Sequence, residues 1–137
     1  KVKNIVVFKG DVFVKEDFVL CSDVLHIYYN ENNEIVTINA GGNVRIFQEN
    51  KTATAENAEY DRLERNLILT GKAVVRQCAN TVEGTKITVN LDTEYAYVQG
   101  ETSGRVKAVI LPGAGKDCQG KIYNIAELNE AICKPGR

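Results

Sequence analysis

The sequence predicts an all-β fold built from stacked antiparallel strands, and three observations lead to this fold class. The chain repeats itself with a period of roughly 30 residues, which is typical of units that stack because one unit cannot bury its own apolar face. Within each repeat, apolar and polar residues alternate with the period of two expected for a strand with one buried face. The segment before residue 112 shows no helical periodicity between the strands, so consecutive strands are expected to pair with one another.

Glycines mark the phase of the repeat. They recur at intervals of 32, 29 and 29 residues, at Gly10, Gly42, Gly71 and Gly100. The downstream half of the unit repeats as well, because residues 21–26 align with residues 55–60 and 84–89. Two segments that agree in phase make a chance similarity improbable.

The strands follow from the alternation and from the turn-forming residues between them. Strands are expected at 5–14, 18–29, twice within 35–60, and at 67–77, 82–91, 95–98 and 105–111. Polar connections at 15–17, 30–34, 61–66, 79–81 and 92–94 separate them, since Asn, Asp and Glu favour turns over strands. The glycine inside a strand is expected to mark a bend or a bulge. Pro112 and Gly113 end the last strand.

The tail differs from the repeats, so residues 1–111 are expected to form the β-domain and residues 112–137 a separate tail. Asn124 can cap a short helix over 124–134, with Glu127 as its capping-box partner. Three apolar residues would then share one face of that helix: Ile125, Leu128 and Ile132. We expect this helix to cover one end of the stack, because an uncovered sheet edge invites further pairing.

Counting by twos from each glycine predicts which side chains face inward, and in the strands that contain a glycine every one of them is apolar. The strands with a glycine contribute Val6, Phe8, Val12, Val14, Ile38, Ala40, Val44, Ile46, Leu67, Leu69, Ala73, Val75, Ala96 and Val98. The strands between them are expected to contribute Val24, His26, Tyr28, Ala58, Tyr60, Ile87, Val89 and Leu91. The opposite face, which includes Arg45 and Lys72, is mixed and is expected to be solvated.

Composition and motifs exclude several classes of function. The 137 residues carry a net charge of −1 without any cluster of basic residues, which argues against nucleic acid as a partner. No apolar stretch is long enough for a transmembrane helix. The single histidine, His26, lies in a packing position, and the acidic residues lie mainly in turns, so neither a catalytic site nor a cofactor is expected.

The four cysteines lack the spacing of a metal site, and no metal is expected. Cys118 and Cys133 bracket the helical segment, so a disulfide between them would fasten the tail in an oxidising compartment. Four separate buried thiols are an equally good interpretation, because the sequence alone does not give the connectivity.

The repeat resembles the OstA/LptA-type family, the periplasmic lipopolysaccharide-transport proteins of Gram-negative bacteria. The resemblance is clearest over residues 42–89 and looser over residues 5–111. Its most specific parts are the segment LILTGKA at residues 67–73 and the segment VEGTKI at residues 82–87. The cysteines and the helical tail have no counterpart in the family pattern.

This resemblance implies a twisted, open β-jellyroll that shields the acyl chains of lipopolysaccharide in an apolar trough. It also implies a periplasmic location, partners in the inner and outer membranes, and head-to-tail assembly of copies into a bridge. The residues expected to line the trough are Phe8, Val12, Val14, Ile38, Val44, Ile46, Leu69, Val75, Val89 and Val98. Two alternatives stay open: a β-stack scaffold that binds no lipid, and the periplasmic OstA-like portion of another component of the same export system.

Overall fold

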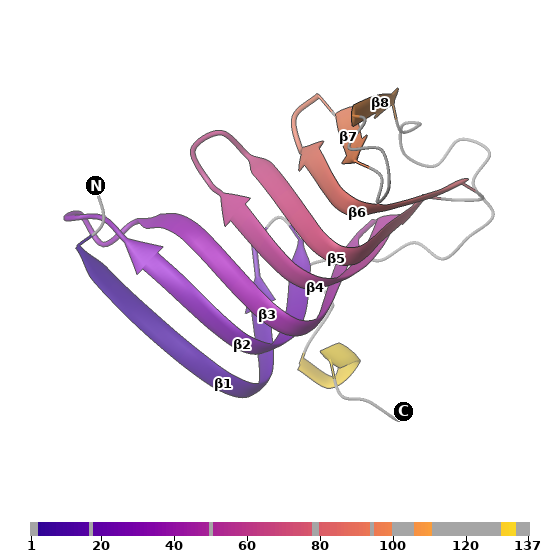
Figure 1. Ribbon diagram of the computed structural model, residues 1–137. Helices are drawn as coiled ribbons and strands as arrows, with labels where there is room; N and C mark the ends of the chain where they lie inside the picture. The colour runs from indigo at the N-terminus through magenta and orange to yellow at the C-terminus, as the bar shows by residue number, and fades with distance from the viewer. Residues whose placement is uncertain are drawn as a thin grey trace.

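The computed structural model describes residues 3–16, 18–49, 51–77, 80–93, 95–99, 106–110 and 130–133. Within these ranges the chain forms one antiparallel sheet of eight strands, in which each strand pairs with the next one in the sequence (Figure 1). The strands are β1 (Asn4–Lys15), β2 (Val19–Tyr29), β3 (Ile35–Gln48), β4 (Lys51–Asp61), β5 (Asn66–Gln77), β6 (Asn80–Asn90), β7 (Tyr95–Gln99) and β8 (Val106–Ile110). The predicted all-β antiparallel fold is confirmed.

The long strands bend near their middles, so that the sheet folds over on itself as an open V (Figure 1). The bends coincide with irregular pairing, for example where Gly42 and Asn43 of β3 lie opposite the single residue Glu56 of β4. An extra residue on one strand bends that strand and increases its twist. The first layer contains residues 4–9, 24–29, 35–41, 57–61, 66–70 and 86–90, and the second contains 12–15, 19–22, 44–48, 51–55, 73–77 and 80–84.

Gly42 and Gly71 are required at two of these bends for two reasons. Both have a φ of +82°, a conformation that L side chains rarely adopt. A Cβ atom added to Gly42 would also lie 2.9 Å from the Cβ of Asp23, and one added to Gly71 would lie 2.7 Å from the Cβ of Glu56. An acidic side chain of the preceding strand therefore packs over each glycine.

The apolar core lies between the two layers. The glycine-based register is confirmed for β3, β4 and β5, whose inward residues are buried in one cluster with those of β6 and β7. The predicted inward set for β2 is wrong. Leu25 and Ile27 face the core, whereas Val24, His26 and Tyr28 alternate with them and lie on the outer face, where the two rings of His26 and Tyr28 stack.

A one-residue slip explains the error in β2. Asp23 packs over Gly42 in the same way that Glu56 packs over Gly71, so residue 23 corresponds to residue 56. The alignment of residues 21–26 with 55–60 had matched Ser22 with Glu56 instead. Because side chains alternate along a strand, a shift of one residue moves every side chain to the opposite face.

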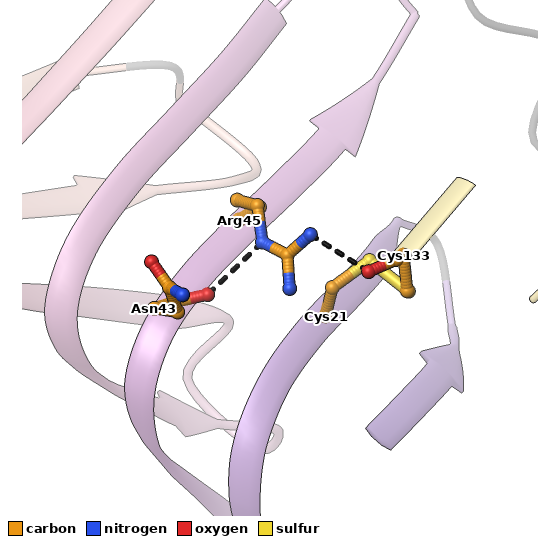
Figure 2. Close-up of a disulfide and its surroundings, with 4 residues drawn as sticks. All are labelled: Cys21, Asn43, Arg45 and Cys133. Carbon is orange, nitrogen blue, oxygen red and sulfur yellow. Dashed lines mark hydrogen bonds between the residues drawn. A yellow bond between two sulfur atoms is a disulfide. The ribbon is translucent and has the colours of Figure 1, made fainter. Parts of the chain in front are cut away.

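The tail returns to the outer face of the sheet near β1 and β2. Its described part is a short 3-10 helix, η2 (Glu130–Cys133), and the remainder of the predicted helix over 124–134 lies outside the described residues. Cys133 forms a disulfide with Cys21 of β2 (Figure 2), so the predicted pairing of Cys133 with Cys118 is wrong. The disulfide holds the described part of the tail against β2.

The described part of the tail buries apolar residues on the outer face of the sheet. Cys133, Cys21 and Val19 form a second buried cluster, against which Phe13, Phe47 and Ile132 pack. Part of the outer face is therefore dry, although the alternation predicted a solvated face. The tail was also expected to cover an end of the stack, and its described part lies on a face of the sheet instead.

Candidate functional site

The candidate site is the apolar interior between the two layers. Eight of the ten residues predicted to line a trough are buried in the single core cluster, and Val14 packs against that cluster. Phe8 is the exception, with 45% of its surface exposed. Phe8 pairs with the buried Leu25, so it belongs to the same face but lies where the second layer does not cover it.

A cleft enters this interior between the layers. It is lined by apolar residues of both layers, with polar residues from the β3–β4 end of the second layer: Phe18, Ile46, Gln48, Lys51, Thr52, Ala53, Leu67, Leu69, Val75, Val89 and Leu91. The space inside amounts to about 30 Å³, which is room for about two water molecules. At this cleft the side chains of the two layers therefore leave little free space between them.

Phe18 closes the layers at the end of the cleft. It follows the β1–β2 turn of the second layer, and its ring meets the ring of Tyr60 in the first layer edge-on, with the centroids 5.0 Å apart. Both side chains are 1% exposed. Nearby, Nε of Arg62 lies 3.8 Å from Oε1 of Glu16, so an ion pair also joins the two layers.

Sequence reasoning had placed Phe18 at the start of a strand and did not include it in the lining. The sequence did contain one signal for a buried Phe18: an aromatic residue directly after a charged turn would be exposed to solvent unless another part of the chain covered it. The contact across the layers depends on the bends in both strands, which the local pattern does not reveal.

Polar contacts on the outer surface lie at the tail and at the loop end of the first layer. Arg45 donates one hydrogen bond to the carbonyl oxygen of Asn43 at 3.0 Å and a second to that of Cys133 at 2.8 Å, which ties η2 to β3 (Figure 2). At the loop end of the first layer, Arg65 pairs with Asp92 at 2.7 Å, and Leu63 is 88% exposed. The described ranges contain no group of three residues suited to a metal ion.

β1 forms one edge of the described sheet, and its first half is exposed on both faces. Ile5, Val6, Val7 and Phe8 are between 39% and 54% exposed. Consecutive exposed apolar residues on an edge strand are uncommon in monomeric proteins, because such an edge can pair with another chain.

Among the described residues, no helix is long and apolar enough to cross a membrane.

Comparison with known proteins then decides the family. Residues 1–95 match the model of the family described as LptA/(LptD N-terminal domain) LPS transport protein. The chain belongs to this family. The match covers the glycine-marked repeats from β1 to the start of β7, the region whose inward faces form the interior.

A solved structure shows the same fold. The chain is similar to LptH from Pseudomonas aeruginosa, described as the LptA homologous periplasmic component of the lipopolysaccharide transport device. The TM-score is 0.65 at 21% identity, with 79% of this chain and 85% of LptH covered. No curated protein matches the chain. The open jellyroll architecture of this family is thus shared by the chain.

Proposed function

We propose that this member of the family is a periplasmic, non-enzymatic carrier that shields the acyl chains of lipopolysaccharide between its two layers. The observation that carries the proposal is the continuous apolar interior, to which every described strand from β1 to β7 contributes, in a chain of a lipopolysaccharide-transport family. Apolar walls make no directional bonds, so a bound chain can slide along them.

The magnitude of the hydrophobic effect explains why such shielding is needed. Burial of one methylene group is worth about 0.8 kcal/mol, so about ten methylenes of one acyl chain correspond to roughly 8 kcal/mol. Exposure of several chains would make passage through water too slow to be useful. Because this cleft holds only about 30 Å³ of free space, the layers must separate or a side chain must move before a chain enters the cleft.

The exposed half of β1 supports a second part of the proposal, which is end-to-end assembly. Ile5 and Val7 lie on the edge strand and are exposed, and the described part of the tail packs on the outer face near Cys21 rather than beside them. A strand from another copy, or from a membrane component with the same fold, can then extend the sheet at this edge. This arrangement would continue the interior from one copy to the next.

Two other functions fit the same observations. A tightly packed core is also what a scaffold that binds no lipid would have. The family description moreover covers both LptA and the N-terminal domain of LptD, so a role as the OstA-like portion of another export component is compatible with the match.

Site-specific photocrosslinking to lipopolysaccharide tests the proposal. The photoreactive residue is placed at Ile46 or Val75, which are buried in the interior, and at Thr54 or Lys72, which are exposed outer controls. Arg45 is unsuitable as an outer control because it holds Cys133. Adducts at the inner positions alone support the carrier, whereas folded protein without inner adducts supports the scaffold.

A further inference from the structure

The cleft between the layers is lined in part by an aromatic side chain, Phe18, that follows a turn. Ile46, Ala53 and Val75 line it from the second layer, and Leu67, Leu69 and Val89 line it from the first. Phe18 instead comes from the end of a turn and lies between the two walls, with its ring against Tyr60. It is the bulkiest apolar side chain among the lining residues.

Phe18 is the largest apolar group that lines the cleft. With its ring in place, the free space in the cleft is about 30 Å³. A phenyl ring occupies the volume of several methylene groups, so its departure would open space for a segment of an acyl chain while removing an apolar competitor for the same walls.

The Phe18 ring is held by the core, where it packs against Tyr60, and its backbone is held by the turn that precedes it. The amide nitrogen of Glu16 donates a hydrogen bond to the carbonyl oxygen of Phe18 at 2.7 Å, which keeps the turn tight. The ion pair between Glu16 and Arg62 is long, at 3.8 Å, and the Arg62 side chain is 51% exposed. Partly exposed pairs of this kind contribute little stability, so the turn can move without disruption of the sheet ladders.

We propose that Phe18 is an internal occupant of the acyl-chain site, and that its displacement admits the end of an acyl chain to the cleft. Phe18 and the chain are alternative ligands of the same apolar walls, and the ring keeps the interior dry while no lipid is bound. The inference rests on the proposed carrier function, because it names the residue that controls access to the same interior.

A size series at residue 18 tests the inference in the full chain. The variants are Phe18→Ala, Phe18→Leu and Phe18→Trp, and the probe is a fluorescent polyene fatty acid whose emission rises in apolar surroundings. Phe18→Ala is expected to bind about tenfold more tightly than the parent chain, with Phe18→Leu between them and Phe18→Trp weaker than the parent. Leu63→Ala is the matched control, since Leu63 is apolar but 88% exposed.

The outcomes separate the inference from simple loosening of the fold. An affinity that is unchanged across the series, or a rise in Leu63→Ala equal to that in Phe18→Ala, would overturn it. Circular dichroism identifies variants that retain the β-fold. If Phe18→Ala does not fold, the other two variants still test the inference, because Phe18→Leu is expected to raise the affinity for the fatty acid and Phe18→Trp to lower it. Unchanged binding in that pair would also overturn the inference.

Lipopolysaccharide crosslinking at Ile46 distinguishes this inference from the carrier function. If the fatty acid follows the size series but lipopolysaccharide gives no adduct at Ile46, Phe18 controls the cleft and the proposed carrier function fails. If lipopolysaccharide gives adducts at Ile46 and residue 18 has no influence on the affinity for the fatty acid, the assignment to Phe18 is wrong and the carrier function stands.

Discussion

The two halves of β1 each contain a run of apolar residues, but their surroundings are very different. In the first half, Val6 and Phe8 face inward and remain 39% and 45% exposed. In the second half, Val12 is 6% exposed in the core, and Phe13 packs outward against the cluster beneath the tail. The position of a residue along the strand therefore selects the face of its side chain, whereas the opposite layer and the tail decide whether that face is dry.

The largest expected effect comes from removal of the covalent link that holds the tail on the second half. The double variant Cys21→Ala, Cys133→Ala is expected to lose about 4 kcal/mol of unfolding free energy, because the disulfide closes a long loop between residues 112 positions apart. Denaturant unfolding measures this loss. Reductant added to the parent chain should produce a similar loss, and a double variant as stable as the oxidised parent contradicts the account.

A matched pair of phenylalanines sharpens the comparison within β1. Phe13→Ala is expected to cost about 2 kcal/mol because Phe13 packs against the cluster of Val19, Cys21 and Cys133. Phe8→Ala is expected to cost under about 1 kcal/mol because nearly half of Phe8 is exposed. Thermal unfolding of both variants checks the order, and equal losses would show that the two halves are packed alike.

A smaller effect is expected where the tail is tied to β3. Arg45→Met keeps most of the side-chain length but removes the hydrogen bond to the carbonyl oxygen of Cys133, at a cost of about 1 kcal/mol. Hydrogen exchange should rise at Val19 and Cys21 and stay unchanged at Leu69 in the core. Uniform acceleration at all three sites would mean that Arg45 supports the whole sheet.

The smallest change in stability is expected at the exposed half of β1. Val7→Lys should alter the free energy of unfolding by less than about 0.5 kcal/mol, because Val7 is exposed. It should nevertheless weaken self-association in analytical ultracentrifugation, since a charge on an edge strand opposes pairing. Thr54→Lys, on the central strand β4, is the control. Equal association of both variants contradicts assembly through β1.

Much of the fold was predictable because its determinants are local. The glycine repeat indicated where the strands bend, and counting by twos from Gly42 and Gly71 identified the inward faces of β3 and β5. Nine of the ten predicted lining residues belong to the core or pack against it. Whether they contact lipid stays a prediction.

The errors arose where a distant segment decides the outcome. The one-residue error in the alignment at Asp23 exchanged the predicted inward and outward faces of β2. The position of the bulge depends on residues of the neighbouring strands, which the sequence of β2 alone does not reveal. The disulfide partner of Cys133 is 112 positions away, so proximity in the sequence pointed to the wrong cysteine. Phe18 contacts Tyr60 only after both layers have formed.

The proposed carrier function requires that the inward face receives acyl chains along its whole length, from the exposed Phe8 to the enclosed Ile46. Lipopolysaccharide crosslinking from a photoreactive residue at each of these two positions tests this requirement. Adducts are expected at both positions, with the yield at Ile46 rising in a Phe18→Ala background. Adducts at Phe8 alone, with Ile46 silent in both backgrounds, would mean that lipid adheres to the exposed edge and does not enter the protein.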